Sequence, residues 1–102
     1  MAEVVGYSHL TRATVPERSW DGTWFALQTL KGYLQSFPGH IMTRISARPV
    51  ANGEVRVIVS IHWQHPEQLE AWRESDLSIA RMFQTIEPAP HDIEEETLED
   101  FS

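Results

Sequence analysis

The clearest pattern in the chain is an alternating run that ends at a proline and continues at helical spacing. One face of the run over residues 54–63 is wholly apolar, which predicts a strand, and its members are Val57, Val59, Ile61 and Trp63. After Pro66, which suits the first turn of a helix, apolar residues recur every three or four positions over 66–86: Leu69, Trp72, Ile79, Phe83 and Ile86. Ser75 and Asp76 interrupt this stripe. Because such side chains compete for backbone hydrogen bonds, we expect a break there, with Ser75 or Asp76 capping the second half.

The N-terminal half predicts a strand, a helix and a second strand. Alternation over residues 4–13 predicts the first strand, with Val5, Tyr7 and His9 on one face. Apolar residues then recur at helical spacing, and they are Trp20, Trp24, Leu27, Leu30, Leu34 and Phe37. Two start signals for this helix compete, at Glu17 and after Asp21-Gly22. Pro38-Gly39 ends this helix. The next strand spans 40–50, and the side chains on one of its faces are Ile41, Thr43, Ile45 and Ala47.

Asn52-Gly53 is the strongest turn signal, because both residues tolerate the positive φ of a type I′ hairpin. Residues 91–98 form a last, acidic strand or arm at the sheet edge. The order βαββαβ predicts one α+β domain over 1–102, a ferredoxin-like fold with an antiparallel four-stranded sheet. Two helices cover only one face of such a sheet. We therefore expect a homodimer in which two sheets face each other.

A strand ending in Trp63, a turn, a helix carrying Trp72, and then Ser75-Asp76 resemble the antibiotic biosynthesis monooxygenase family, with support from Pro38-Gly39 upstream. The resemblance covers nearly the whole chain. It implies a dimeric α/β barrel. The family includes quinone-forming oxygenases, haem degraders and proteins of other roles.

Composition and charge limit the kinds of partner and chemistry that this protein can have. The net charge is −7, and the last twelve residues hold six acids and no Lys or Arg, so no basic cluster is available for nucleic acid. The chain has no Cys, which excludes disulfide and thiolate chemistry. No apolar run reaches the ~20 residues of a membrane span. With no signal-peptide pattern at the start, we expect a cytoplasmic protein.

The haem-degrading branch of the family can be compared residue by residue. That branch has an Asn on the first strand, a pocket Trp on the second helix and a haem-ligating His ten positions later. Trp72 matches the Trp, but Met82 stands where the His belongs, and Ser8 or His9 where the Asn belongs. We therefore expect no cofactor. His62-x-x-His65 has a metal-like spacing, but no third ligand is positioned, so we predict no metal site.

The quinone-forming branch oxidises electron-rich phenolic substrates with dioxygen and needs neither metal nor flavin. The resemblance thus implies a cofactor-independent monooxygenase, an oxidoreductase acting on an aromatic or quinol-type molecule. A dry aromatic pocket with a polar group would promote deprotonation of the substrate. We predict His9 or Tyr7 as the catalytic group, and the ligand-binding residues are Trp72, Met82, Phe83, Trp63 and His62.

Two other functional hypotheses remain open. The chain could be a non-catalytic dimeric module that binds a small molecule or haem, or an interaction domain that uses its acidic arm. The pattern alone favours plain core for Trp72, because large aromatic residues dominate the cores of small domains, and its role in a pocket comes from the family resemblance.

Overall fold

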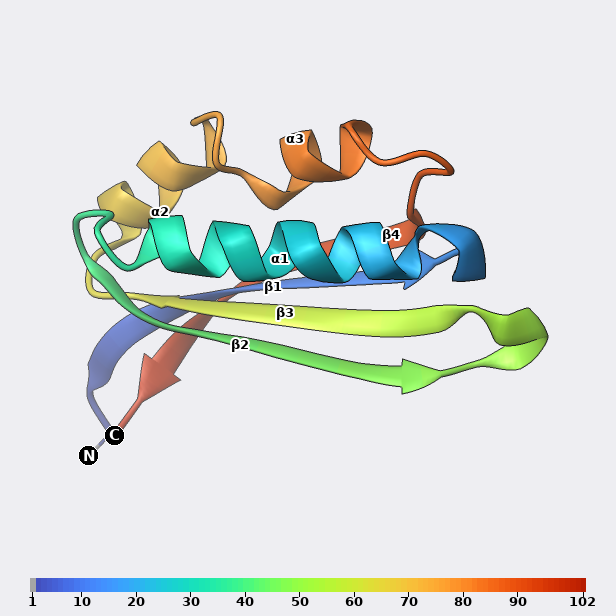
Figure 1. The fold of residues 1–102 in the computed structure, drawn as a ribbon. Helices are drawn as coiled ribbons and strands as arrows, with labels where there is room; N and C mark the ends of the chain where they lie inside the picture. Colours follow the sequence, from blue (N-terminus) through green and yellow to red (C-terminus); the bar gives the residue numbers. More distant parts are fainter. Residues whose placement is uncertain (1) are drawn as a thin grey trace.

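The predicted switches between strand and helix appear in the expected order in a computed structural model, which describes residues 2–102. Helices lie on one side of a single antiparallel sheet, and the two chain ends lie close together (Figure 1). The elements are β1 Val4–Val15, a 3₁₀ turn Glu17–Ser19, α1 Trp20–Leu34, β2 His40–Pro49, β3 Val55–Trp63, α2 Pro66–Arg73, α3 Ile79–Gln84 and β4 His91–Phe101.

The strand order is β2-β3-β1-β4, with every neighbouring pair antiparallel. This confirms the ferredoxin-like βαββαβ arrangement. β1 runs two residues further than predicted, to Val15, because Thr14 and Val15 continue the pairing with β3. β4 occupies an edge, as expected for a strand carrying so much charge.

The central hairpin turns at Asn52-Gly53, as predicted. Both residues have positive φ, 65° and 74°, and the amide of Glu54 donates to the carbonyl of Ala51 at 3.4 Å. These are the conditions of a type I′ turn, whose twist matches that of the flanking strands.

The helical region begins at Glu17, the first of the two predicted start signals, and the later start after Asp21-Gly22 was predicted wrongly. Residues Glu17–Ser19 form a 3₁₀ turn, and α1 proper begins at Trp20, so that Asp21-Gly22 lies inside the helix. The buried stripe of α1 is Thr23, Leu27, Leu30 and Leu34. Trp24, which we expected in this stripe, is 44% exposed. Thr23 takes the inward position instead, because its hydroxyl donates to the carbonyl of Ser19 at 2.7 Å.

The break in the second helical region lies where it was expected, but the cap was predicted wrongly. α2 ends at Arg73, and Ser78 caps α3 by accepting a bond from the amide of Arg81. Ser75 shapes the linker: its hydroxyl donates to the carbonyl of Trp72 at 2.7 Å and accepts from the amide of Leu77 at 3.1 Å. The hydroxyl of Ser75 thus bridges the end of α2 and the linker, and the N-cap of α3 is Ser78, three residues later.

The core lies between the helices and the sheet. It contains the predicted apolar face of β3 and the inward residues of α1, α2 and α3. Ile41, which we placed on one face of β2 with Thr43 and Ile45, is 50% exposed, because the register with β3 shifts between His40 and Met42. Thr43 is buried and Ile45 packs partly buried against the core, whereas Ala47, the last residue of that face, is exposed.

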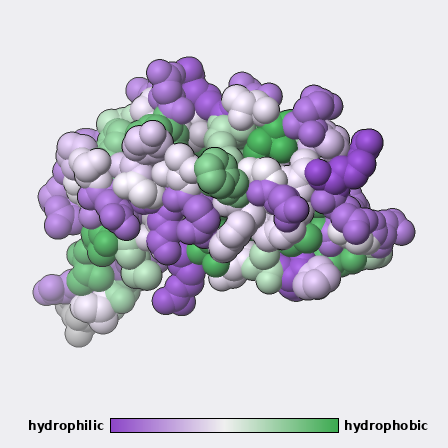
Figure 2. All heavy atoms as spheres, in the orientation of Figure 1, coloured by the Kyte–Doolittle hydropathy of each residue, from purple (hydrophilic) through white to green (hydrophobic). Residues whose placement is uncertain are grey.

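The acidic arm pairs with β1 along its length, from Thr14↔His91 to Val4↔Phe101. Its backbone therefore docks on the body, while the side chains of Ile93, Leu98 and Phe101 stay 43–60% exposed. Figure 2 shows hydrophobic surface gathered where the chain ends meet, and Val4, Val5, Ile41 and Phe101 are exposed in that part of the fold.

Candidate functional site

The predicted catalytic histidine points toward the helices and is enclosed. His9 is paired with Ile61 on β3, and only 1% of its surface is exposed. Its ring meets the Trp72 indole edge-on, with the ring centroids 5.1 Å apart. Nδ1 lies 3.4 Å from the Thr11 hydroxyl.

The other nitrogen of His9 is the unusual one. Nε2 lies 3.3 Å from Oε1 of Glu95 on β4, but the two are not aligned for a hydrogen bond. The contact is therefore electrostatic, and a buried imidazole nitrogen is left without a hydrogen-bond partner in the described chain.

Burial lowers the pKa of the His9 imidazole below its ordinary value, because desolvation disfavours the charged form. The carboxylates of Glu95 and Glu70 oppose this effect, while the Arg73 guanidinium adds to it. The ring is thus held neutral near pH 7, in the form of a general base, but a substrate must displace core side chains to touch it.

Trp72 and Trp63 belong to the same enclosed cluster. Trp72 is 1% exposed and Trp63 is fully buried, and their rings lie 5.7 Å apart. The indole N–H of Trp72 donates to the carbonyl of Leu77 at 2.8 Å. Phe83 also belongs to the hydrophobic core, and the partly buried side chain of Tyr7 packs against this core. Side chains of the core therefore fill the space around Trp72, Trp63 and Phe83, three of the predicted ligand-binding residues.

His62 lies on the opposite face of the sheet. It is paired with Ser8 on β1, next to His9 but pointing the other way. Its Nδ1 lies 2.8 Å from the Ser8 hydroxyl and 3.2 Å from Asp100, and its Nε2 lies 3.0 Å from Ser60. Ser8 and Asp100 share one nitrogen of the ring, whereas a hydrolytic triad needs them on different nitrogens. The cluster is a satisfied polar network.

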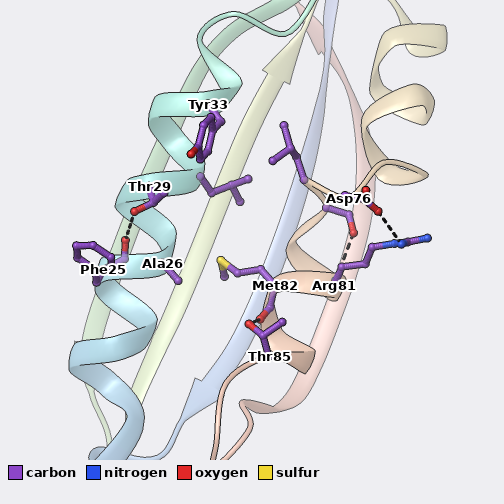
Figure 3. A pocket seen from close by; sticks show the side chains of 11 residues that line it. Phe25, Ala26, Thr29, Tyr33, Asp76, Arg81, Met82 and Thr85 are labelled. Carbon is purple, nitrogen blue, oxygen red and sulfur yellow. Dashed lines mark hydrogen bonds and ion pairs between the residues drawn. The ribbon is translucent and has the colours of Figure 1, made fainter.

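A groove in the helical layer is the largest hollow described, with a volume of about 500 Å³. α1 forms one wall, and the α2–α3 linker with α3 forms the other (Figure 3). Its lining residues are Phe25, Ala26, Thr29, Leu30, Tyr33, Asp76, Leu77, Ser78, Arg81, Met82 and Thr85. This volume falls in the range of ~300–1,000 Å³ that small-molecule sites occupy.

The groove is apolar along its floor and polar at its rim. Met82 points across it toward α1 (Figure 3). Phe25 and Tyr33 are 73% and 60% exposed, which is far more than aromatic side chains usually are in a small domain. At one end Arg81 donates to the Asp76 carboxylate at 2.9 Å. This arrangement can hold a flat apolar molecule and meet one polar substituent.

Of the predicted ligand-binding residues, the groove includes only Met82. The structure brings His9, Trp72 and Trp63 together in the core, and places His62 on the far face. The part of α1 that lines the groove was missed, although a signal was present: Phe25, Thr29 and Tyr33 lie four residues apart, outside the core stripe. The ring of Phe25 itself turns away from α3 (Figure 3).

Two further observations bear on the class of site. Within residues 2–102, no three His, Cys, Asp or Glu side chains gather closely enough to hold a metal ion. In the described part of the chain, no helix is long and apolar enough to cross a membrane.

No family model and no curated protein match the sequence, so the comparisons rest on solved structures. A protein described as a putative antibiotic biosynthesis monooxygenase from Nitrosomonas europaea is similar, with a TM-score of 0.74 and 11% identity over 96% of this chain and 92% of that one. A mutant of SnoaB, a cofactor-independent oxygenase from Streptomyces nogalater, is also similar. Its TM-score is 0.69, with 9% sequence identity over 92% of this chain and 91% of that one.

A de novo designed protein, Foldit4, also matches, with a TM-score of 0.66 and 16% identity over 93% of this chain and 98% of that one. A designed protein among the matches shows that this backbone by itself implies no activity. The chain therefore shares the ferredoxin-like fold of proteins named as antibiotic biosynthesis monooxygenases.

Proposed function

We propose that this chain binds a small, flat, largely apolar molecule in the groove between α1 and α3. The observation that carries the proposal is the groove itself, apolar in its lining and about 500 Å³ in volume. An aromatic ring system would pack against Leu30, Leu77 and Met82. A hydroxyl or carbonyl on it would meet the polar rim formed by Thr29, Ser78 and Arg81.

Filling the groove should weaken binding without harming the fold. Ala26 lines the groove, whereas Gln28, two residues along α1, is exposed and lines none of the pockets described. We expect Ala26→Phe to weaken the binding of 1-naphthol, measured by titration calorimetry, by tenfold or more, a change of ~1.4 kcal/mol.

Gln28→Phe is the matched control and should bind as the parent does. Equal affinity in all three proteins would contradict a site in the groove.

Cofactor-independent oxygenation is the second candidate. Two observations favour it: the fold is shared with a cofactor-independent oxygenase, and His9 is a buried base with a lowered pKa that packs edge-on against Trp72. In such a reaction a ring CH₂ flanked by phenolic rings becomes a carbonyl. The substrate gains one oxygen atom from O₂, and the second oxygen leaves as water with both hydrogens. The substrate supplies all four electrons.

His9 does not line the groove, so this reaction requires the substrate to pass between Trp72 and the α2–α3 linker. Oxygen uptake with anthrone as substrate tests it. We expect His9→Gln to reduce the rate by roughly 10²-fold or more, as loss of a general base does, and His91→Gln to leave it unchanged. Binding of anthrone without oxygen uptake would reject oxygenation and leave the binding proposal intact.

A further inference from the structure

The groove between α1 and α3 does not end where its apolar floor ends. Ala26 and Thr85 lie toward the end of the groove that is farther from Tyr33 (Figure 3). The same two residues line a second hollow, which has a volume of about 370 Å³. Because the two hollows share a residue from each wall, they form one continuous trough.

The second hollow lies between the start of the first helical region and the end of α3. Arg18 and Gly22 line it on one side, and Ile86 and Glu87 line it on the other. An α-helix rises about 1.5 Å per residue, so the part of α1 from Gly22 to Tyr33 alone extends over roughly 16 Å. A bicyclic molecule such as 1-naphthol is much shorter than the trough and fills only the first hollow.

The two ends of the trough differ in the pairing of their cations. At the end near the α2–α3 linker, the Arg81 guanidinium donates to the Asp76 carboxylate at 2.9 Å. At the other end Arg18 is exposed, and among residues 2–102 no carboxylate lies within ion-pair distance of it. The second hollow therefore offers a cation whose charge no acidic side chain of the described chain neutralises at close range.

The chemistry of the second hollow favours a single carboxylate. A guanidinium group presents a planar fork of N–H donors that matches the two oxygens of a carboxylate. Glu87 lies on the opposite wall and also forms no ion pair within residues 2–102. Its negative charge repels anions, and it repels a doubly charged phosphate monoester more than a monocarboxylate.

Gly22 keeps the second hollow open. A Cβ at this position would meet no atom within 4 Å, so no close contact requires a glycine there. Glycine inside a helix is less stable than alanine by about 1 kcal/mol. A larger side chain at Gly22 can therefore occupy the hollow without disturbing α1.

We propose that the trough binds an elongated molecule with a flat apolar body and one carboxylate at its far end. The body lies in the first hollow against Leu30 and Met82, and the carboxylate pairs with Arg18 in the second. This inference rests on the proposed binding function and names the class of ligand, an aromatic compound that carries a single acid on an alkyl chain.

Two matched ligands test the carboxylate. The first is 6-(5-hydroxy-1-naphthyl)hexanoic acid, which is 1-naphthol extended by an acid chain on its other ring, and the second is the corresponding neutral hexanamide. In titration calorimetry we expect the acid to bind roughly tenfold more tightly than the amide, because it gains charge-assisted hydrogen bonds. Arg18→Gln should remove this difference and leave the affinity for 1-naphthol unchanged. Lys31→Gln is the control, because it removes a cation of α1 that lines neither hollow.

Filling the second hollow tests its place in the site. Gly22→Leu should weaken binding of the acid roughly tenfold or more and leave 1-naphthol binding unchanged. Gly32→Leu is the matched control, because Gly32 is also a glycine of α1 with room for a Cβ, and it lines none of the pockets described.

The outcomes separate this inference from the function on which it rests. If the acid and the amide bind the parent equally, or if Gly22→Leu and Gly32→Leu bind the acid equally, the second hollow takes no carboxylate, and the 1-naphthol site stands. If the parent binds none of the three ligands, the proposed function fails and the inference fails with it.

Discussion

Replacing Trp72 with alanine should remove ~3–5 kcal/mol of stability, enough to unfold most of so small a domain at room temperature. The side chain is 1% exposed, packs against Trp63 and His9, and donates its indole N–H to the carbonyl of Leu77. Its loss opens a large cavity and leaves that carbonyl without its partner. Urea unfolding followed by circular dichroism measures the effect.

Trp24→Ala is the matched control, because it removes the same side chain from a position that is 44% exposed. We expect a change of about 1 kcal/mol or less there. If Trp72→Ala left a stable fold and abolished ligand binding, Trp72 would be a pocket wall after all.

The second large effect is a dependence of the unfolding free energy on pH, which comes from the titration of His9. Burial lowers its folded pKa, while in the unfolded chain the ring titrates near its ordinary value of 6.5. Below pH 6.5 the unfolded state therefore binds more protons, so stability is full above that pH and falls as the pH decreases toward the folded pKa. The loss from one such group is at most ~1.4 kcal/mol per pH unit.

We expect the unfolding free energy of the parent to fall between pH 7.5 and 5.5, and His9→Gln to flatten that slope. Desolvation also lowers the pKa of His40, so part of the slope should remain. The pKa of exposed His91 is raised, mainly by its hydrogen bond to Glu54, so His91→Gln should steepen the slope. An unchanged slope in His9→Gln would mean that folding does not change the pKa of this ring, and would contradict a pKa lowered by burial.

The fold could be predicted because local signals agreed with each other. The wholly apolar face of β3, the Asn52-Gly53 turn and Pro66 at the start of α2 each act over a few residues, and all appear in the structure. The errors occurred where two local bonds compete. Ser75 bonds back to Trp72 instead of capping α3, and this choice depends on the linker that buries Leu77.

The site was harder to predict because a groove depends on the distance between two helices. Periodicity shows which side of α1 faces the core, but it does not show that α3 lies far enough away to leave Phe25 and Tyr33 without a neighbour. The direction of His9 depended likewise on the register of β1 against β3, which no residue of β1 determines by itself. Trp72 drew attention as an aromatic near a helix break, and the structure uses it as core.

Methionine methyl resonances offer the most direct test of the ligand site. The chain has three methionines, of which Met82 lines the groove and Met42 lies on the far face of the sheet. With the methyl groups labelled with carbon-13 and assigned by substitution, titration with 1-naphthol should shift the Met82 signal progressively to saturation and leave the Met42 signal in place. A saturable shift at Met42 with none at Met82, or no shift at either, would contradict a binding site between α1 and α3.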